Sequence, residues 1–112
     1  NIEEMATWLA SSKRFSFGEG WGQLVQSMFH EVLGRLSERG IDTETVTDKD
    51  FEVKEKRGRL SCHAFRFDCL EDILERYEHK SQRICEVCGG VGRLSGDGSY
   101  WLATRCREHR VF

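Results

Sequence analysis

Two short cysteine-containing motifs lie near the C-terminal end of this chain. Cys85 and Cys88 form a Cys-x2-Cys pair, and after 17 further residues Cys106 and His109 form a Cys-x2-His pair. Two close pairs at this separation are typical of tetrahedral structural zinc sites, because each short turn directs two ligands at one ion. We therefore predict that Cys85, Cys88, Cys106 and His109 hold one structural zinc ion.

The stretch between the two pairs predicts a β-hairpin that brings the second pair back to the first. Gly96-Asp97-Gly98 suits the hairpin tip, with residues 93–94 before it and residues 100–102 after it. Gly89 and Gly90 allow the chain to bend after the first pair, so that backbone amides can approach the sulfurs. Residues 84–112 are therefore predicted to form a zinc-ribbon-like module.

Other uses of the cysteines fit the pattern less well. A thioredoxin-like redox pair at Cys85 and Cys88 would follow a strand and open a helix, whereas here a predicted helix precedes the pair and glycines follow it. A catalytic zinc would need an open position for water, which four protein ligands do not leave. Five cysteines cannot all pair within one chain, which disfavours a disulfide framework; Cys62 and Cys69 are expected to be small buried residues.

Helical periodicity is clearest over Trp21 to Arg39. The apolar residues of this segment recur three and four positions apart and so share one face of a helix. They are Trp21, Leu24, Val25, Met28, Phe29, Val32, Leu33 and Leu36. Gly40 follows as a C-terminal cap that can adopt positive φ. A shorter helix is predicted around Met5–Ala10.

The segment from Glu44 to Phe67 predicts a β-hairpin. Residues 56–59 (Lys-Arg-Gly-Arg) supply the turn, with Gly58 able to adopt positive φ. A two-residue loop at Arg57 and Gly58 gives a consistent register, because it places apolar residues opposite one another. The expected partners are Val53 with Cys62, Phe51 with Ala64, Glu55 with Leu60, and Glu52 with His63. Phe65 and Phe67 fall on the other face, which predicts either a bulge near Ala64 or burial of both faces.

A further helix is predicted after Asp68, whose spacing from Glu71 matches a capping box. Its apolar face comprises Leu70, Ile73, Leu74 and Tyr77. Together these elements predict an α+β fold, with two helices packed on a β-hairpin over residues 18–83 and the zinc-binding module packed on that core. Residues 1–112 are expected to form a single domain.

Composition narrows the range of functions. The chain has 112 residues and a net charge of −2, and no apolar run approaches the length needed to cross a bilayer, so we expect a cytoplasmic protein. Residues 1–56 carry 7 basic and 11 acidic side chains, and residues 57–112 carry 10 and 8. Neither half has the dense basic surface of a dedicated nucleic-acid binder. No nucleophile has a histidine and an acid arranged around it, so we expect no enzymatic activity and no small-molecule substrate.

The chain contains an ordered pattern of three segments: GEGWGQLV (18–25), VKEKRGRL (53–60) and ICEVCGGVGRL…YWLATRCREH (84–109). This pattern resembles that of a family of small, uncharacterised zinc-binding proteins encoded by bacteriophages, prophages and other mobile elements. The resemblance supports the four zinc ligands. It marks further motif positions of unassigned role at Trp21, Lys54, Lys56, Gly58 and Leu60. The chain departs from the family pattern where Arg57 replaces an aromatic residue and where Val91 replaces a proline.

The resemblance implies an accessory protein of a phage or other mobile element, which acts in the cytoplasm of a bacterial host cell by binding a host or phage protein. An inhibitor of a host defence system, such as an anti-CRISPR protein, is one such role. The alternative is a nucleic-acid-binding zinc-ribbon regulator, since arginine and aromatic side chains lie on or beside the predicted hairpin. The candidate contact residues for either partner are Arg93, Tyr100, Trp101, Arg105 and Arg107.

Overall fold

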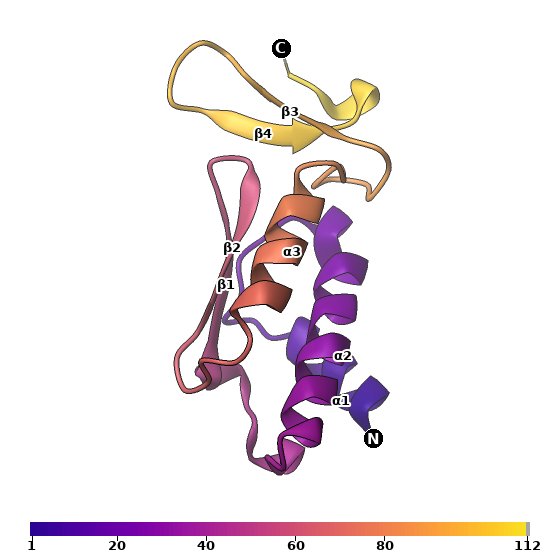
Figure 1. The fold of residues 1–112 in the computed structure, drawn as a ribbon. Coiled ribbons are helices and arrows are strands. Elements are labelled where there is room, and N and C mark those ends of the chain that lie inside the picture. The colour runs from indigo at the N-terminus through magenta and orange to yellow at the C-terminus, as the bar shows by residue number, and fades with distance from the viewer. Residues whose placement is uncertain (112) are drawn as a thin grey trace.

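The computed structural model describes residues 1–111 and confirms an α+β fold (Figure 1). Only Phe112, the last residue of the predicted module, lies outside the described residues. The helices are α1 (Ile2–Ala10), α2 (Gly22–Glu38) and α3 (Glu71–Ser81), and the strands are β1 (Phe51–Lys56), β2 (Arg59–Ala64), β3 (Arg93–Gly96) and β4 (Leu102–Arg105). Four short 3-10 turns complete the elements: η1 (Glu19–Trp21), η2 (Thr43–Thr45), η3 (Asp48–Asp50) and η4 (Arg107–His109).

The elements divide between an α+β core and a hairpin at one end of the molecule. Helices α1 and α3 both pack on α2, and α3 lies beside β2. The β3–β4 hairpin lies across the end formed by the β1–β2 turn and the last turn of α3 (Figure 1). The result is elongated, with principal extents of 47 × 23 × 21 Å.

Helix α2 supplies the centre of the core. The predicted apolar face is buried along its whole length, and Trp21, Val25, Phe29 and Leu36 have no exposed surface. Burial of each such side chain contributes roughly 1.5–3 kcal/mol of transfer free energy. Gly40 adopts a φ of 79° just after the helix, as the C-cap prediction required. The predicted short N-terminal helix is present as α1, which begins earlier, at Ile2.

The β1–β2 hairpin has the predicted register. Phe51 pairs with Ala64, Val53 with Cys62, Glu55 with Leu60, and Glu52 with His63. Arg57 and Gly58 occupy the loop with φ values of 55° and 84°, which is the positive-φ pair that a type I′ turn requires. The Glu55 carboxylate accepts a 2.7 Å hydrogen bond from the Gly58 N–H and closes this turn.

The ends of the hairpin differ from the prediction. The first strand begins at Phe51 rather than near Glu44, because Asp42 and Thr47 side chains accept local backbone hydrogen bonds and stabilise 3-10 turns instead. The second strand ends at Ala64 without a bulge. Phe65 is 62% exposed, so the second alternative, burial of both faces of the hairpin, does not hold at this end.

Helix α3 begins without the predicted capping box. Its first helical residue is Glu71 and its N-cap is Leu70, with no side-chain cap hydrogen bond, so Asp68 lies two residues before the position that a capping box requires. Acidic residues in that turn, Glu71 and Asp72, complement the helix dipole in its place. The predicted apolar face is correct, since Leu70, Ile73, Leu74 and Tyr77 are buried.

Two of the outer backbone groups of β2 are bonded to α3. The Leu60 N–H donates to the Ser81 hydroxyl at 2.9 Å, and the Cys62 N–H donates to the Glu78 carboxylate at 2.8 Å. These bonds fix the end of α3 next to the β1–β2 turn, where the cysteine-rich segment begins. Within residues 1–111, none of the helices has the length and apolar composition needed to cross a lipid bilayer.

Candidate metal centre

The structure brings Cys85, Cys88, Cys106 and His109 together. Their ligand atoms all lie within 4.8 Å of one another. The separations include 3.7 Å between the sulfurs of Cys88 and Cys106, 3.7 Å from Cys85 Sγ to His109 Nδ1, and 3.1 Å from Cys106 Sγ to the same nitrogen. A tetrahedron with metal–sulfur bonds of about 2.3 Å has edges of about 3.8 Å. Three thiolates and one imidazole at these spacings could therefore hold a single metal ion.

The first ligand pair lies in a tight turn directly after α3. The Cys85 N–H donates to Gly90 O at 2.7 Å, and the Gly89 N–H donates back to Cys85 O at 2.9 Å. Gly89 has a φ of 82°, a conformation that side chains disfavour. The Gly90 N–H lies 3.4 Å from the Cys88 sulfur, so the predicted approach of a backbone amide to a ligand is confirmed.

The second pair follows β4, with His109 at the end of η4. Two contacts hold it against the first pair. The Glu86 N–H donates to Thr104 O at 3.0 Å, and the Glu86 carboxylate pairs with Arg105 at 2.9 Å. The two cysteine-containing turns are therefore joined by backbone and side-chain bonds in addition to the shared ligand cluster.

The pKa values of Cys85 and Cys88 reflect the close packing of several thiols in the cluster. Burial alone would raise the pKa of Cys85, but hydrogen bonds from the backbone amides of Cys106, Cys88 and Val87 lower that pKa to about 6. At Cys88 the Gly90 amide lowers the pKa, yet burial and the neighbouring thiols of Cys106 and Cys85 raise it overall. One thiolate therefore forms readily, while further thiolates beside it require a compensating positive charge.

The first metal-ligand turn rests on the glycine-rich segment before α2. The Gly20 N–H donates to Glu86 O at 2.8 Å, and the buried indole of Trp21 donates from Nε1 to Ile84 O at 2.7 Å. A Cβ atom added at Gly20 would lie 2.1 Å from Cys85 O and 2.6 Å from Gly89 N. The GEGW motif thus has a structural role that sequence reasoning missed: it provides a side-chain-free surface at Gly20 and two hydrogen-bond donors, the Gly20 N–H and the Trp21 indole, for the segment that carries the first ligand pair.

The β1–β2 turn forms a second support beneath the β3–β4 hairpin (Figure 1). The fully buried hydroxyl of Thr104 donates to Gly58 O at 2.5 Å. A Cβ atom at Gly58 would lie 2.4 Å from Leu94 Cδ1 and 3.1 Å from Ala103 N. Two of the marked motif positions, Trp21 and Gly58, therefore both contact the module that carries the ligands.

The predicted partner-contact residues are distributed over the β3–β4 hairpin and the turn after it. Arg93 is exposed and lies opposite Arg105 in the register, and Tyr100 is 88% exposed in the loop between the strands. Arg105 is half-buried, pairs with Glu86, and places its guanidinium carbon 5.4 Å from the centre of the Trp101 ring. Arg107 is exposed in η4. Of the five predicted contact residues, Arg105 and Trp101 therefore lie beside each other.

Cys62 and Cys69 are half-buried and lie against the core, apart from the ligand cluster. Burial raises the pKa of the Cys62 thiol to about 12, and its sulfur lies 3.8 Å from that of Met28. A protonated thiol packed on methionine is a core contact and not a metal ligand. His63 is exposed on β2, across from Glu52, as predicted.

No protein-family model, curated protein or solved structure matches the chain.

Proposed function

We propose that Cys85, Cys88, Cys106 and His109 bind one zinc ion whose role is structural. Residues 84–111 contain only three buried side chains, those of Cys85, Ala103 and Thr104. An isolated two-stranded hairpin is at best marginally stable in water. A metal ion that joins both ends of the hairpin supplies the stabilisation that so small a core lacks, and four protein ligands fill a tetrahedral shell.

We further propose that the stabilised module binds another protein. The observation that carries this proposal is the distribution of large exposed apolar side chains. Among residues 1–111, six of the eight belong to the module: Val87, Val91, Leu94, Tyr100, Trp101 and Val111. Exposed apolar surface that is contiguous marks interaction sites, and the concentration of these side chains in one small module favours a partner there. With the resemblance of the motifs to mobile-element proteins, this favours an accessory protein that binds a bacterial host protein, such as a component of a defence system that an anti-CRISPR protein would inhibit.

Charge favours a protein partner over nucleic acid. Residues 84–111 carry four arginines and three acidic side chains, and three thiolates around a Zn²⁺ ion add about one negative charge. Arg105 is already paired with Glu86. The alternative function, a zinc-ribbon regulator that stacks nucleobases on Tyr100 and Trp101, would have to act with little net positive charge.

Affinity capture from a bacterial host lysate tests the protein-binding proposal. Wild-type chain should retain a specific protein that a Val91→Ser/Tyr100→Ser variant loses. A Trp8→Ser variant is the control, because Trp8 is an exposed apolar residue that lies outside the module. Capture of no specific protein would contradict the proposal. Binding to single- or double-stranded nucleic acid that weakens steeply over a salt series would support the alternative.

A further inference from the structure

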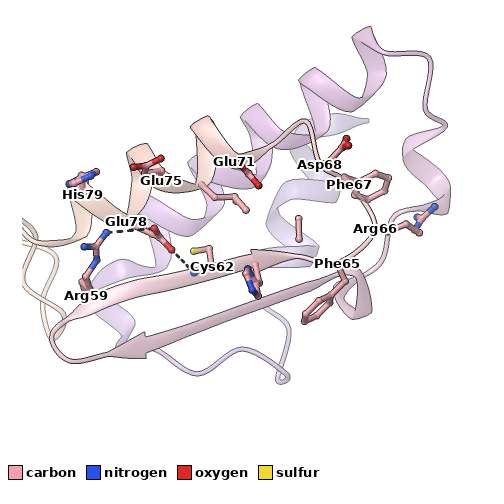
Figure 2. A pocket seen from close by; sticks show the side chains of 13 residues that line it. Arg59, Cys62, Phe65, Arg66, Phe67, Asp68, Glu71, Glu75, Glu78 and His79 are labelled. Carbon is pink, nitrogen blue, oxygen red and sulfur yellow. Dashed lines mark hydrogen bonds and ion pairs between the residues drawn. The ribbon is translucent and has the colours of Figure 1, made fainter.

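A groove of about 810 Å³ lies between β2 and α3, on the core and apart from the metal centre (Figure 2). Its strand side includes Cys62 and Ala64, and its helix side includes Glu71 and Glu75. Phe65, which is 62% exposed, lies at the end of the groove where β2 stops. The groove therefore combines a strand edge, an exposed aromatic ring and helix carboxylates.

The backbone of β2 is unpaired along part of this groove. Because Leu60 and Cys62 donate their N–H groups to α3, the alternation of a β-strand directs the Ala64 N–H away from β1 as well. Among residues 1–111, no acceptor is present for the Ala64 N–H, and no donor for the carbonyls of Cys62 or Ala64. Unpaired N–H and C=O groups at the edge of a sheet can form hydrogen bonds with a further strand.

The helix side of the groove is negatively charged. Within the described chain, Asp68, Glu71 and Glu75 form no ion pair and no side-chain hydrogen bond, and Figure 2 shows the three carboxylates along α3 and the loop before it. The two arginines that line the groove are already occupied: Arg59 pairs with Glu78 at 3.6 Å, and Arg66 pairs with Asp50 at 3.0 Å. The groove therefore has unmatched negative charge available to a cationic ligand.

The spacing of the carboxylates suits an extended peptide. Glu71 and Glu75 are four residues apart on α3, which corresponds to a rise of about 6 Å along the helix axis. Alternate side chains on one face of a β-strand are about 6.8 Å apart. Two basic side chains at positions i and i+2 of a strand added beside β2 would therefore reach both glutamates.

We propose that the groove binds an extended, basic segment of a partner protein, which adds to the outer edge of β2 as a third strand. Backbone hydrogen bonds are made at Cys62 and Ala64, and lysine or arginine side chains at alternate positions pair with Glu71 and Glu75. An apolar residue of the segment lies against Phe65. In strand addition of this type, backbone hydrogen bonds provide the affinity, and contacts of alternate side chains provide the selectivity. The inference goes beyond the proposed function, because it concerns a surface outside residues 84–111.

Fluorescence anisotropy with a fluorescein-labelled peptide of alternating lysine and valine tests the proposal on the full chain. We expect saturable binding that weakens about fivefold in Glu71→Gln/Glu75→Gln, from the loss of two partly exposed ion pairs. A Glu3→Gln/Glu44→Gln variant removes the same charge from exposed sites elsewhere and should bind as the wild type does. An alternating glutamate–valine peptide should not bind.

The same peptide with N-methyl groups on alternate amides separates strand addition from general charge attraction. Strand addition predicts that N-methylation on the edge-facing amides abolishes binding, since those amides can no longer donate. Equal affinity for the methylated peptide, equal affinity of the two charge variants, or no binding of the alternating lysine–valine peptide would each overturn the proposal. Binding is measured well below the unfolding temperature of both charge variants, where circular dichroism shows each to be folded, so that affinity differences do not come from lost structure.

Discussion

The indole Nε1 of Trp21 donates a 2.7 Å hydrogen bond to the backbone carbonyl of Ile84, the residue directly before the first metal-ligand candidate. The two residues are 63 positions apart in the chain. This bond connects the start of the central helix to the start of the cysteine-rich module. The position of the ligand cluster is therefore set by the core as well as by any bound metal.

Replacement of this indole should destabilise the fold. Trp21→Phe keeps an aromatic ring but removes the donor, so that Ile84 O loses its partner and a small cavity remains. We expect a loss of about 1–3 kcal/mol in the free energy of unfolding, measured by urea denaturation. Trp8→Phe is the control, because Trp8 is 59% exposed and should change stability by less than about 0.5 kcal/mol. Equal effects of the two substitutions would contradict the role assigned to Trp21.

Gly20→Ala should separate the cysteine turn from the core. The added Cβ would lie 2.1 Å from Cys85 O, so the backbone must move, at a cost of about 1–3 kcal/mol. Gly34→Ala is the matched control: it lies in α2 with no atom within 4 Å of the added Cβ, and should stabilise the helix by up to about 1 kcal/mol. Thermal unfolding compares the two. A Gly20→Ala protein as stable as the wild type would show that this close packing is not required.

Thr104→Val tests the second support. Valine has nearly the same shape but leaves Gly58 O without the hydroxyl that now donates to it, and loss of a buried partner costs about 1–3 kcal/mol. Thr45→Val removes a comparable hydroxyl–carbonyl bond at an exposed site and should have little effect on the urea midpoint. If both variants unfold at the wild-type midpoint, the Thr104–Gly58 bond does not stabilise the module.

Acid should weaken the contact between α2 and α3. Hydrogen bonds from Arg76 and then from Tyr77 lower the pKa of Glu31 below its ordinary value of 4.5. A carboxyl whose folded-state pKa is depressed stabilises the fold above its unfolded pKa and loses that contribution as the pH falls through the folded value. The stability difference between wild type and Glu31→Gln should therefore be largest near neutral pH and shrink below pH 4.5. A difference independent of pH, measured by urea denaturation from pH 7 to pH 3, would contradict this assignment.

Local patterns in the sequence predicted much of the fold. The hairpin register followed from the alternation of Phe51, Val53 and Leu60 around a turn that needs Gly58, and the face of α2 followed from its helical period. The ligand cluster followed from the spacing of two Cys-containing pairs. In each case the information lies within a few residues or within one repeating pattern.

Features that depend on contacts between distant segments were not predictable in this way. The packing of Gly20 against Cys85 joins residues 65 positions apart, and no repeating pattern in the sequence relates the two positions. The failed capping box at Asp68 has a similar origin: its spacing from Glu71 was suitable, but α3 begins later, where Arg35 from α2 binds Asp72 and Cys69 O. Tertiary contacts decided the helix boundary there.

Metal content and chelator-dependent unfolding test whether the four ligands hold a structural zinc ion. We expect one zinc ion per chain by native mass spectrometry, and its loss in both Cys85→Ser and Cys106→Ser. A strong chelator should lower the unfolding temperature of the wild type, whereas a Cys69→Ser protein should keep its zinc. A folded wild-type chain that contains no metal, and that unfolds at the same temperature with and without chelator, would show that zinc has no structural role.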